Sequence, residues 1–181
     1  MRGLQAVAGL ALAIGLGAAL AVPTVAAETA HDQNALQMAA DACSNQEFSS
    51  LLQAMAISDA VVARHSAHSV SVIVDGVKTL VPREGYRDFP IGMLDYYWIS
   101  RASMQAWEAN PDTELVHLKL ERNQSQSNQW RIDYVAVRYD GNSSGGDDLG
   151  DVGETIGTPG YLLFEPIAGC WELVEHGAGA P

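Results

Sequence analysis

Apolar residues first fall into a regular pattern beyond residue 43, where their spacing is helical. Ser44 and Glu47 precede the pattern and fit a Ser-x-x-Glu capping box, in which each side chain binds an amide of the first turn. Ser58 and Asp59 favour a second, short helix that ends near His65. The apolar residues of the first helix lie at i, i+3, i+4 and i+7, which places them on one face: Phe48, Leu51, Leu52 and Met55.

From Ser69 the period of the pattern becomes two, which is typical of half-buried strands. Valines recur at every second residue, from 70 to 74, with Ser71, Ile73 and Asp75 between and after them. Asp75-Gly76 is a dipeptide typical of a two-residue hairpin turn. Further strands are predicted over 77–81, 91–99, 114–122, 130–139, 161–165 and 170–175. Residues 100–110 predict a short helix or a folded connection, ended by Asn110-Pro111-Asp112.

This order of elements predicts an α+β fold. We expect one or two N-terminal helices packed on a curved antiparallel sheet of about seven strands, with the helical stripe covering the inner face of the sheet. The domain spans residues 44–176. Residues 28–43 are a flexible or weakly helical leader, and 177–181 are a disordered tail.

The first 27 residues predict export. Arg2 precedes an apolar run over 4–22, followed by Pro23 and small residues at 25–27, which is the pattern of a cleaved signal peptide. We expect a periplasmic or secreted protein that begins at Glu28 and makes no stable membrane insertion after cleavage. A retained membrane anchor is the alternative, since the run approaches the length of a membrane span.

The charge of the chain is strongly acidic. The formal net charge is −12, and it falls to −13 when Arg2 leaves with the leader. A polyanion such as nucleic acid is therefore repelled, whereas a basic protein or a metal cation is attracted. High solubility is the simpler interpretation of the same charge.

The two cysteines, Cys43 and Cys170, lie near opposite ends of the mature chain. In an exported protein such a pair most simply forms one disulfide. The long loop that it closes corresponds to about 4–5 kcal/mol of stabilisation in the chain-entropy description. Free thiols or a metal pair are the alternatives, but neither cysteine has a His or Cys at ligand spacing.

An acidic, glycine-rich segment resembles a calcium loop. Gly145 would occupy position 6, where the loop turns tightly around the ion. Asp147 at position 8 and Asp rather than Glu at position 12 depart from the usual pattern, and a solvated linker is the alternative. We expect no cofactor unless calcium binds at this segment. Its ligands would be Asp140, Asn142, Ser144, Asp148 and Asp151.

His65 and His68 form a His-x-x-His pair. Two histidines one helical turn apart can bind zinc when a third ligand is present. The pair straddles the predicted helix-to-strand junction, however, and a histidine near a helix C-terminus is favoured by the helix dipole alone. The dipole interpretation is the simpler one.

Aromatic and acidic residues suggest a pocket, although such aromatic residues also commonly form a core or its rim. Asp95 or Asp133 would be its general base if the domain were an enzyme. No Gly-x-Ser-x-Gly or phosphate-binding glycine pattern occurs, so we name no catalytic residue. The candidate pocket residues are Asp95, Tyr97, Trp98, Trp107, Trp130, Asp133 and Tyr134.

The layout of residues 44–176 resembles the cone-shaped nuclear-transport-factor-like (SnoaL-like) superfamily. Exported bacterial members often end in a strand of the form Gly-x-Trp-x-Leu, matched here by Gly169, Trp171 and Leu173. The early Asp75-Gly76 hairpin departs from the longer helical segment usual before the first strands. The superfamily contains isomerases and non-enzymatic modules, and the resemblance implies a ligand-sized cavity at the open end of the cone.

These observations favour an exported, non-enzymatic binding domain whose partner is a basic protein. The alternatives are a small-pocket enzyme or small-molecule-binding protein of the cone-shaped class, and a domain stabilised by calcium.

Overall fold

A computed structural model describes residues 29–142 and 148–179. The helices within these ranges are α1 (Ala30–Asn45), α2 (Phe48–Ile57), α3 (Asp59–Arg64), the 3-10 turn η1 (Arg83–Gly85) and α4 (Arg101–Ala109). The strands are β1 (Ser66–Val74), β2 (Val77–Pro82), β3 (Ile91–Leu94), β4 (Tyr97–Ser100), β5 (His117–Gln124), β6 (Trp130–Tyr139), β7 (Val152–Ile167) and β8 (Cys170–Gly177). The predicted signal peptide lies outside the described residues.

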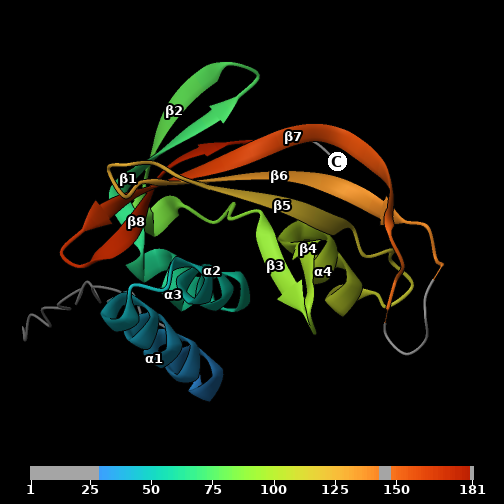
Figure 1. The fold of residues 1–181 in the computed structure, drawn as a ribbon, viewed down its shortest axis with the longest axis horizontal. Helices are drawn as coiled ribbons and strands as arrows, with labels where there is room; N and C mark the ends of the chain where they lie inside the picture. The colour runs from blue at the N-terminus through green and yellow to red at the C-terminus, as the bar shows by residue number, and fades with distance from the viewer. Residues whose placement is uncertain (1–28, 143–147, 180–181) are drawn as a thin grey trace, which may run out of the picture.

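The strands form one curled sheet in the order β2-β1-β8-β7-β6-β5-β4-β3. Its long strands arch over α1, α2 and α3, so the sheet is a half-barrel with helices beneath it (Figure 1). The α+β class is confirmed. The sheet has eight strands rather than about seven and is mixed rather than wholly antiparallel, because β1 and β8 run parallel.

The core forms where α2 meets the sheet. The four residues of the predicted stripe, from Phe48 to Met55, are all buried. The Phe48 ring stacks on Trp130 with 4.7 Å between centroids, and it meets Phe164 and Trp171 edge-on at 5.1 and 5.5 Å. Apolar burial and these ring contacts together hold α2 against three strands.

The first helix begins earlier than the pattern predicted. Thr29 and Asp32 form a capping box, and the buried residues of α1 are small: Ala35, Ala39 and Ala42. The predicted box at Ser44 and Glu47 is wrong, because Ser44 lies in the last turn of α1 and Glu47 makes no side-chain capping bond. Segment 28–43, left open as flexible or weakly helical, is thus helical from Ala30.

The hairpin at Asp75-Gly76 is confirmed. Both residues have positive φ, 50° and 78°, as the turn between β1 and β2 requires. The single strand predicted over 91–99 is wrong: it is the hairpin of β3 and β4, turning at Asp95 with φ 53°. The residue pattern did not predict this turn, because no Gly or Pro occurs in it.

The C-terminal strands are longer than predicted. β7 begins at Val152, well before the strand predicted over 161–165, and Gly177 is the last residue of β8. The amide of Ala178 donates to the Ile73 carbonyl at 2.8 Å, so order continues past the predicted start of the tail. Residues 180–181 lie outside the described residues.

The predicted disulfide between Cys43 and Cys170 is present. It joins the last turn of α1 to the first residue of β8 across 127 residues, with Cα atoms 4.7 Å apart. A disulfide is compatible with an oxidising, extracellular compartment. Among the described residues, no helix is both long enough and apolar enough to cross a membrane.

We predict that Phe48→Ala lowers the free energy of unfolding by about 3–5 kcal/mol, because it leaves a cavity between α2 and the sheet. Urea unfolding measures this loss. Tyr96→Ala is the matched control, since that ring is 87% exposed and its removal should change stability by about 0.5 kcal/mol or less. Equal effects of the two substitutions would contradict the assigned role of Phe48.

Candidate ligand-binding site

A cavity of about 300 Å³ lies between the sheet and the segment that leads from η1 into β3. Most of its wall is apolar, which suits a small organic ligand. The apolar lining residues are Phe89, Pro90, Ala102, Val116, Leu118, Ala136 and Ala178. The polar and charged lining residues include Asp88, Ser100, Arg101, Gln105, Tyr134, Thr158 and His176.

A buried histidine joins two tyrosines at the wall of the cavity. The imidazole of His176, in β8, lies 3.1 Å from the Tyr86 hydroxyl through Nδ1 and 3.0 Å from the Tyr134 hydroxyl through Nε2. The Tyr134 oxygen also accepts from the amide of Gly179 at 3.2 Å. Both ring nitrogens therefore have partners within the protein.

Burial keeps this histidine neutral. The side chain of His176 is 4% exposed, and desolvation lowers its pKa to about 4, against a smaller opposing effect of the Asp88 carboxylate. Burial likewise raises the pKa of Tyr86 and of Tyr134, so both hydroxyls keep their protons at neutral pH. At this part of the wall, His176 and Tyr134 thus offer uncharged hydrogen-bonding groups.

A glycine in β7 makes room for the Tyr134 ring. Tyr134 pairs with Gly160 in the β6–β7 register, and the register shifts between Tyr134 and Ala136. A Cβ atom at residue 160 would lie 2.3 Å from both Cζ and the hydroxyl oxygen of Tyr134. Any side chain there would displace the ring from its position beside His176.

Arg101 fixes the first turn of α4 beside the cavity. Its guanidinium donates to the carbonyls of Met55 at 2.7 Å and Ala56 at 3.0 Å, near the end of α2, and pairs with Asp59. Burial lowers the pKa of Arg101, and Asp59 opposes that shift. Within the described residues the Nε–H group is buried without a hydrogen bond, and the guanidinium carbon lies 5.4 Å from the centre of the Phe89 ring.

The structure does not gather the seven predicted pocket residues. Of these, Tyr134 lines the cavity; Trp130 stacks on Phe48, and Trp98 packs against the core. Trp107 lies half-buried on α4, so the aromatic residues serve mainly as core and rim. Tyr97 instead makes edge-on contacts with the rings of His117 and Tyr139, on another part of the sheet.

Neither predicted general base lies at the cavity. Asp95 is exposed in the β3–β4 turn, and the Asp133 carboxylate accepts from Arg131 at 2.8 Å and from Asn123 at 3.4 Å. Asp88 is the carboxylate that lines the cavity instead. Tyr86, Asp88, Arg101 and His176 were missed because they come from the segment before β3, from α4 and from β8, which only the tertiary fold brings together.

The acidic segment closes a loop between β6 and β7. Asp140 Oδ1 accepts from the amides of Asn142 at 2.9 Å and Asp151 at 3.2 Å, and these bonds lower the pKa of Asp140. The amide of Gly150 donates to Asp148 at 2.9 Å. Ser144 lies outside the described residues, and calcium binding by the five-residue set stays a prediction.

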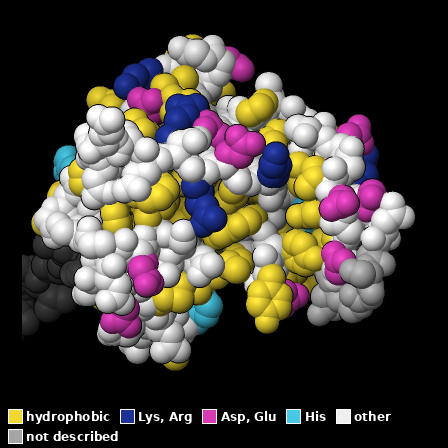
Figure 2. All heavy atoms as spheres, viewed as in Figure 1, with side chains coloured by type: hydrophobic (Ala, Val, Ile, Leu, Met, Phe, Trp, Pro, Cys, Tyr) yellow, Lys and Arg dark blue, Asp and Glu magenta, His cyan; other side chains and the backbone are white. Residues whose placement is uncertain are grey.

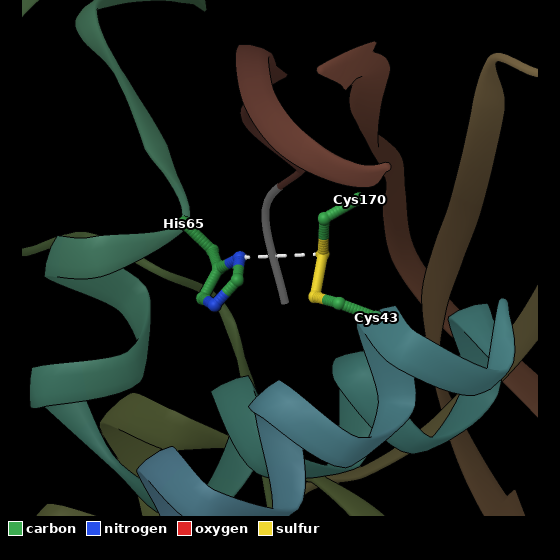
Figure 3. Close-up of side chains that lie close together, drawn as sticks. All are labelled: Cys43, His65 and Cys170. Atoms are coloured by element: carbon green, nitrogen blue, oxygen red, sulfur yellow. Dashed lines mark hydrogen bonds between the residues drawn. A yellow bond between two sulfur atoms is a disulfide. The ribbon is translucent and has the colours of Figure 1, made fainter. Parts of the chain in front are cut away.

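His65 lies beside the disulfide rather than with His68. Its Nδ1 atom is 3.8 Å from Cys170 Sγ and 3.3 Å from the Trp171 carbonyl oxygen (Figure 3). His68 is an exposed residue of β1, so the two histidines do not share a helix face. The helix-to-strand junction separates them, as the sequence indicated.

Comparison with protein-family models and with curated protein sequences finds no match. Among solved structures, the fold is similar to a designed nuclear-transport-factor-2-like protein at 9% identity and TM-score 0.35, covering 82% of this chain and 95% of that chain. It is also similar to a protein from Xanthomonas campestris pv. campestris whose name suggests a polyketide cyclase. There the identity is 15% and the TM-score 0.31, covering 81% of this chain and 87% of that chain. The resemblance is weak and concerns the fold alone.

We predict that the stability of the domain falls as the pH drops from about 6.5 to about 4. The unfolded chain binds a proton at His176 near pH 6.5, whereas the folded domain resists it until about pH 4, so up to about 3 kcal/mol is lost. Urea unfolding at successive pH values measures this dependence.

His176→Gln should remove this part of the pH dependence, whatever it does to stability at pH 7. The exposed His68→Gln serves as the control and should keep the wild-type slope. A wild-type slope in His176→Gln would show that the burial of this imidazole is not its source.

Proposed function

We propose that the domain binds a small, mostly apolar molecule that carries a hydrogen-bonding oxygen. The observation that carries this proposal is the juxtaposition of the Tyr134 hydroxyl and the neutral His176 with an apolar cavity of about 300 Å³. Such a volume is at the lower end for sites that enclose small organic ligands. Tyr134 can turn its O–H group from the 3.4 Å contact with the Gly177 carbonyl towards a ligand oxygen.

Binding is favoured over catalysis by the pairing of the polar groups. Both nitrogens of His176 are already in hydrogen bonds, and Arg101 is committed to α2 and to Asp59. Asp88 is exposed at the rim rather than enclosed beside the tyrosines. A general base needs free access to the proton that it removes, so these contacts support recognition of a ligand.

Ala102→Trp should block the cavity and weaken binding about tenfold or more, because it places an indole at the cavity wall. The probe is the fluorescent dye 8-anilinonaphthalene-1-sulfonate, displaced by a panel of small phenols, ketones and carboxylic acids. Ala106→Trp is the matched control, since Ala106 is also exposed on α4 but does not line the cavity.

Saturable binding of one dye molecule, lost in Ala102→Trp and kept in Ala106→Trp, is the expected result. Tyr134→Phe should then weaken the oxygen-bearing competitors more than it weakens the dye, since it removes one hydroxyl from the wall. Equal binding by both tryptophan variants would place the dye outside the cavity and contradict the proposal.

A second candidate function is the binding of a basic protein partner by the exported domain. The chain has 22 acidic residues against 10 Lys and Arg, and Figure 2 shows Asp and Glu side chains spread over the visible face. Charge of one sign over much of a surface accelerates association with a partner of the opposite sign.

For this candidate we predict capture of a basic periplasmic protein at about 20 mM salt and its release at about 500 mM, because salt screens exposed charges. A pull-down with the double variant Asp148→Asn, Asp151→Asn tests whether the acidic segment between β6 and β7 is needed to capture the partner. Capture that is insensitive to salt, or capture of acidic and basic proteins alike, would exclude electrostatic recognition.

A further inference from the structure

We propose that reduction of the Cys43–Cys170 disulfide creates a zinc site whose three protein ligands are the two thiolates and the His65 imidazole. The ligand atoms of these three residues all lie within 4.8 Å of one another, and they form the one His, Cys, Asp and Glu group of this compactness among the described residues. Figure 3 shows the imidazole facing the sulfur bridge.

The distances suit a tetrahedral ion. With Zn–S of about 2.3 Å and Zn–N of about 2.0–2.1 Å, ligand atoms lie about 3.5–3.8 Å apart. His65 Nδ1 is already 3.8 Å from Cys170 Sγ. The two sulfurs must separate, and Cys43 Sγ, which lies within 4.8 Å of the imidazole, must take its own place around the ion. Each sulfur can move by rotation about its own Cα–Cβ bond.

The backbone holds these residues together without the disulfide. The amide of His65 donates to Val61 at 2.9 Å, and its carbonyl accepts from Leu173 in β8 at 2.7 Å. The Gln46 side-chain amide donates to the carbonyls of Cys43 and Gly169, which joins the end of α1 to the turn before Cys170. Reduction therefore leaves three ligands from three elements near one another.

Zinc binding would require the His65 imidazole to give up one hydrogen-bond contact. His65 Nδ1 lies 3.3 Å from the Trp171 carbonyl, a long contact that a zinc ion at Nδ1 would replace, with the ring proton then on Nε2. All three residues are partly exposed, so a reductant and an ion can reach them. Thiolate and imidazole ligands select zinc over calcium or magnesium. Three protein ligands leave the fourth position to water.

A dithiol reductant converts the disulfide to two thiols. It supplies two electrons and two protons to the Cys43–Cys170 bond, and its own sulfurs become a disulfide. Binding of Zn²⁺ then releases both thiol protons to solvent, and the two thiolates neutralise the charge of the ion.

The experiment titrates Co²⁺, as a coloured substitute for Zn²⁺, into protein reduced with a phosphine under argon. Expected for the wild type is one ion per chain with thiolate-to-cobalt charge-transfer absorption, which Zn²⁺ displaces and which the oxidised protein lacks. His65→Ala, which keeps both cysteines, should bind about tenfold more weakly or worse. His68→Ala, an exposed histidine of β1, should bind as the wild type does.

Failure of the reduced wild type to bind one ion, or equal affinity of His65→Ala and the wild type, would overturn the proposal. If reduction unfolds the chain, circular dichroism replaces absorption as the readout. Recovery of secondary structure with Zn²⁺ in the wild type and in His68→Ala, but not in His65→Ala, supports the site. Absence of recovery in the wild type overturns it.

Discussion

The rest of the structure depends on the hydrophobic packing of α2 against the inner face of the curled sheet. Phe48 contacts aromatic rings from three strands, β6, β7 and β8, so one helical face packs against the middle of the sheet. The disulfide and the alanine face of α1 reinforce this layer from outside. The cavity lies beyond the cover of these helices, where α4 and the segment around Phe89 form the remaining wall.

The wall of the cavity combines two conditions that usually oppose each other. Burial keeps His176 uncharged, yet His176 and Tyr134 at the wall, and Tyr86 behind it, have hydrogen bonds within the protein. The loss of hydration is offset because Tyr86 and Tyr134 take up both ring nitrogens. Under the proposed binding function, this wall would favour a ligand whose oxygen can take over the Tyr134 hydrogen bond to the Gly177 carbonyl.

Local chemistry was readable from the sequence, and contacts between distant strands were not. The stripe from Phe48 to Met55, the Asp75-Gly76 turn and the cysteine pair each follow from residue spacing or from conformational preference, and all are confirmed. The β3–β4 turn escaped because Asp95 adopts positive φ without a glycine. The contacts of His176 with Tyr86 and Tyr134, and of His65 with β8, join segments far apart in the chain, which no local pattern encodes.

The parallel pairing of β1 with β8 has a consequence for how the chain acquires its structure. β8 follows all the other described strands in the sequence, yet it lies between β1 and β7 in the sheet. Until it is in place, the β1–β2 hairpin has no strand to join it to β7, and Phe48 lacks its contact with Trp171. The sheet can therefore be completed only after β8 has been synthesised, and deletion of β8 would divide the sheet in two.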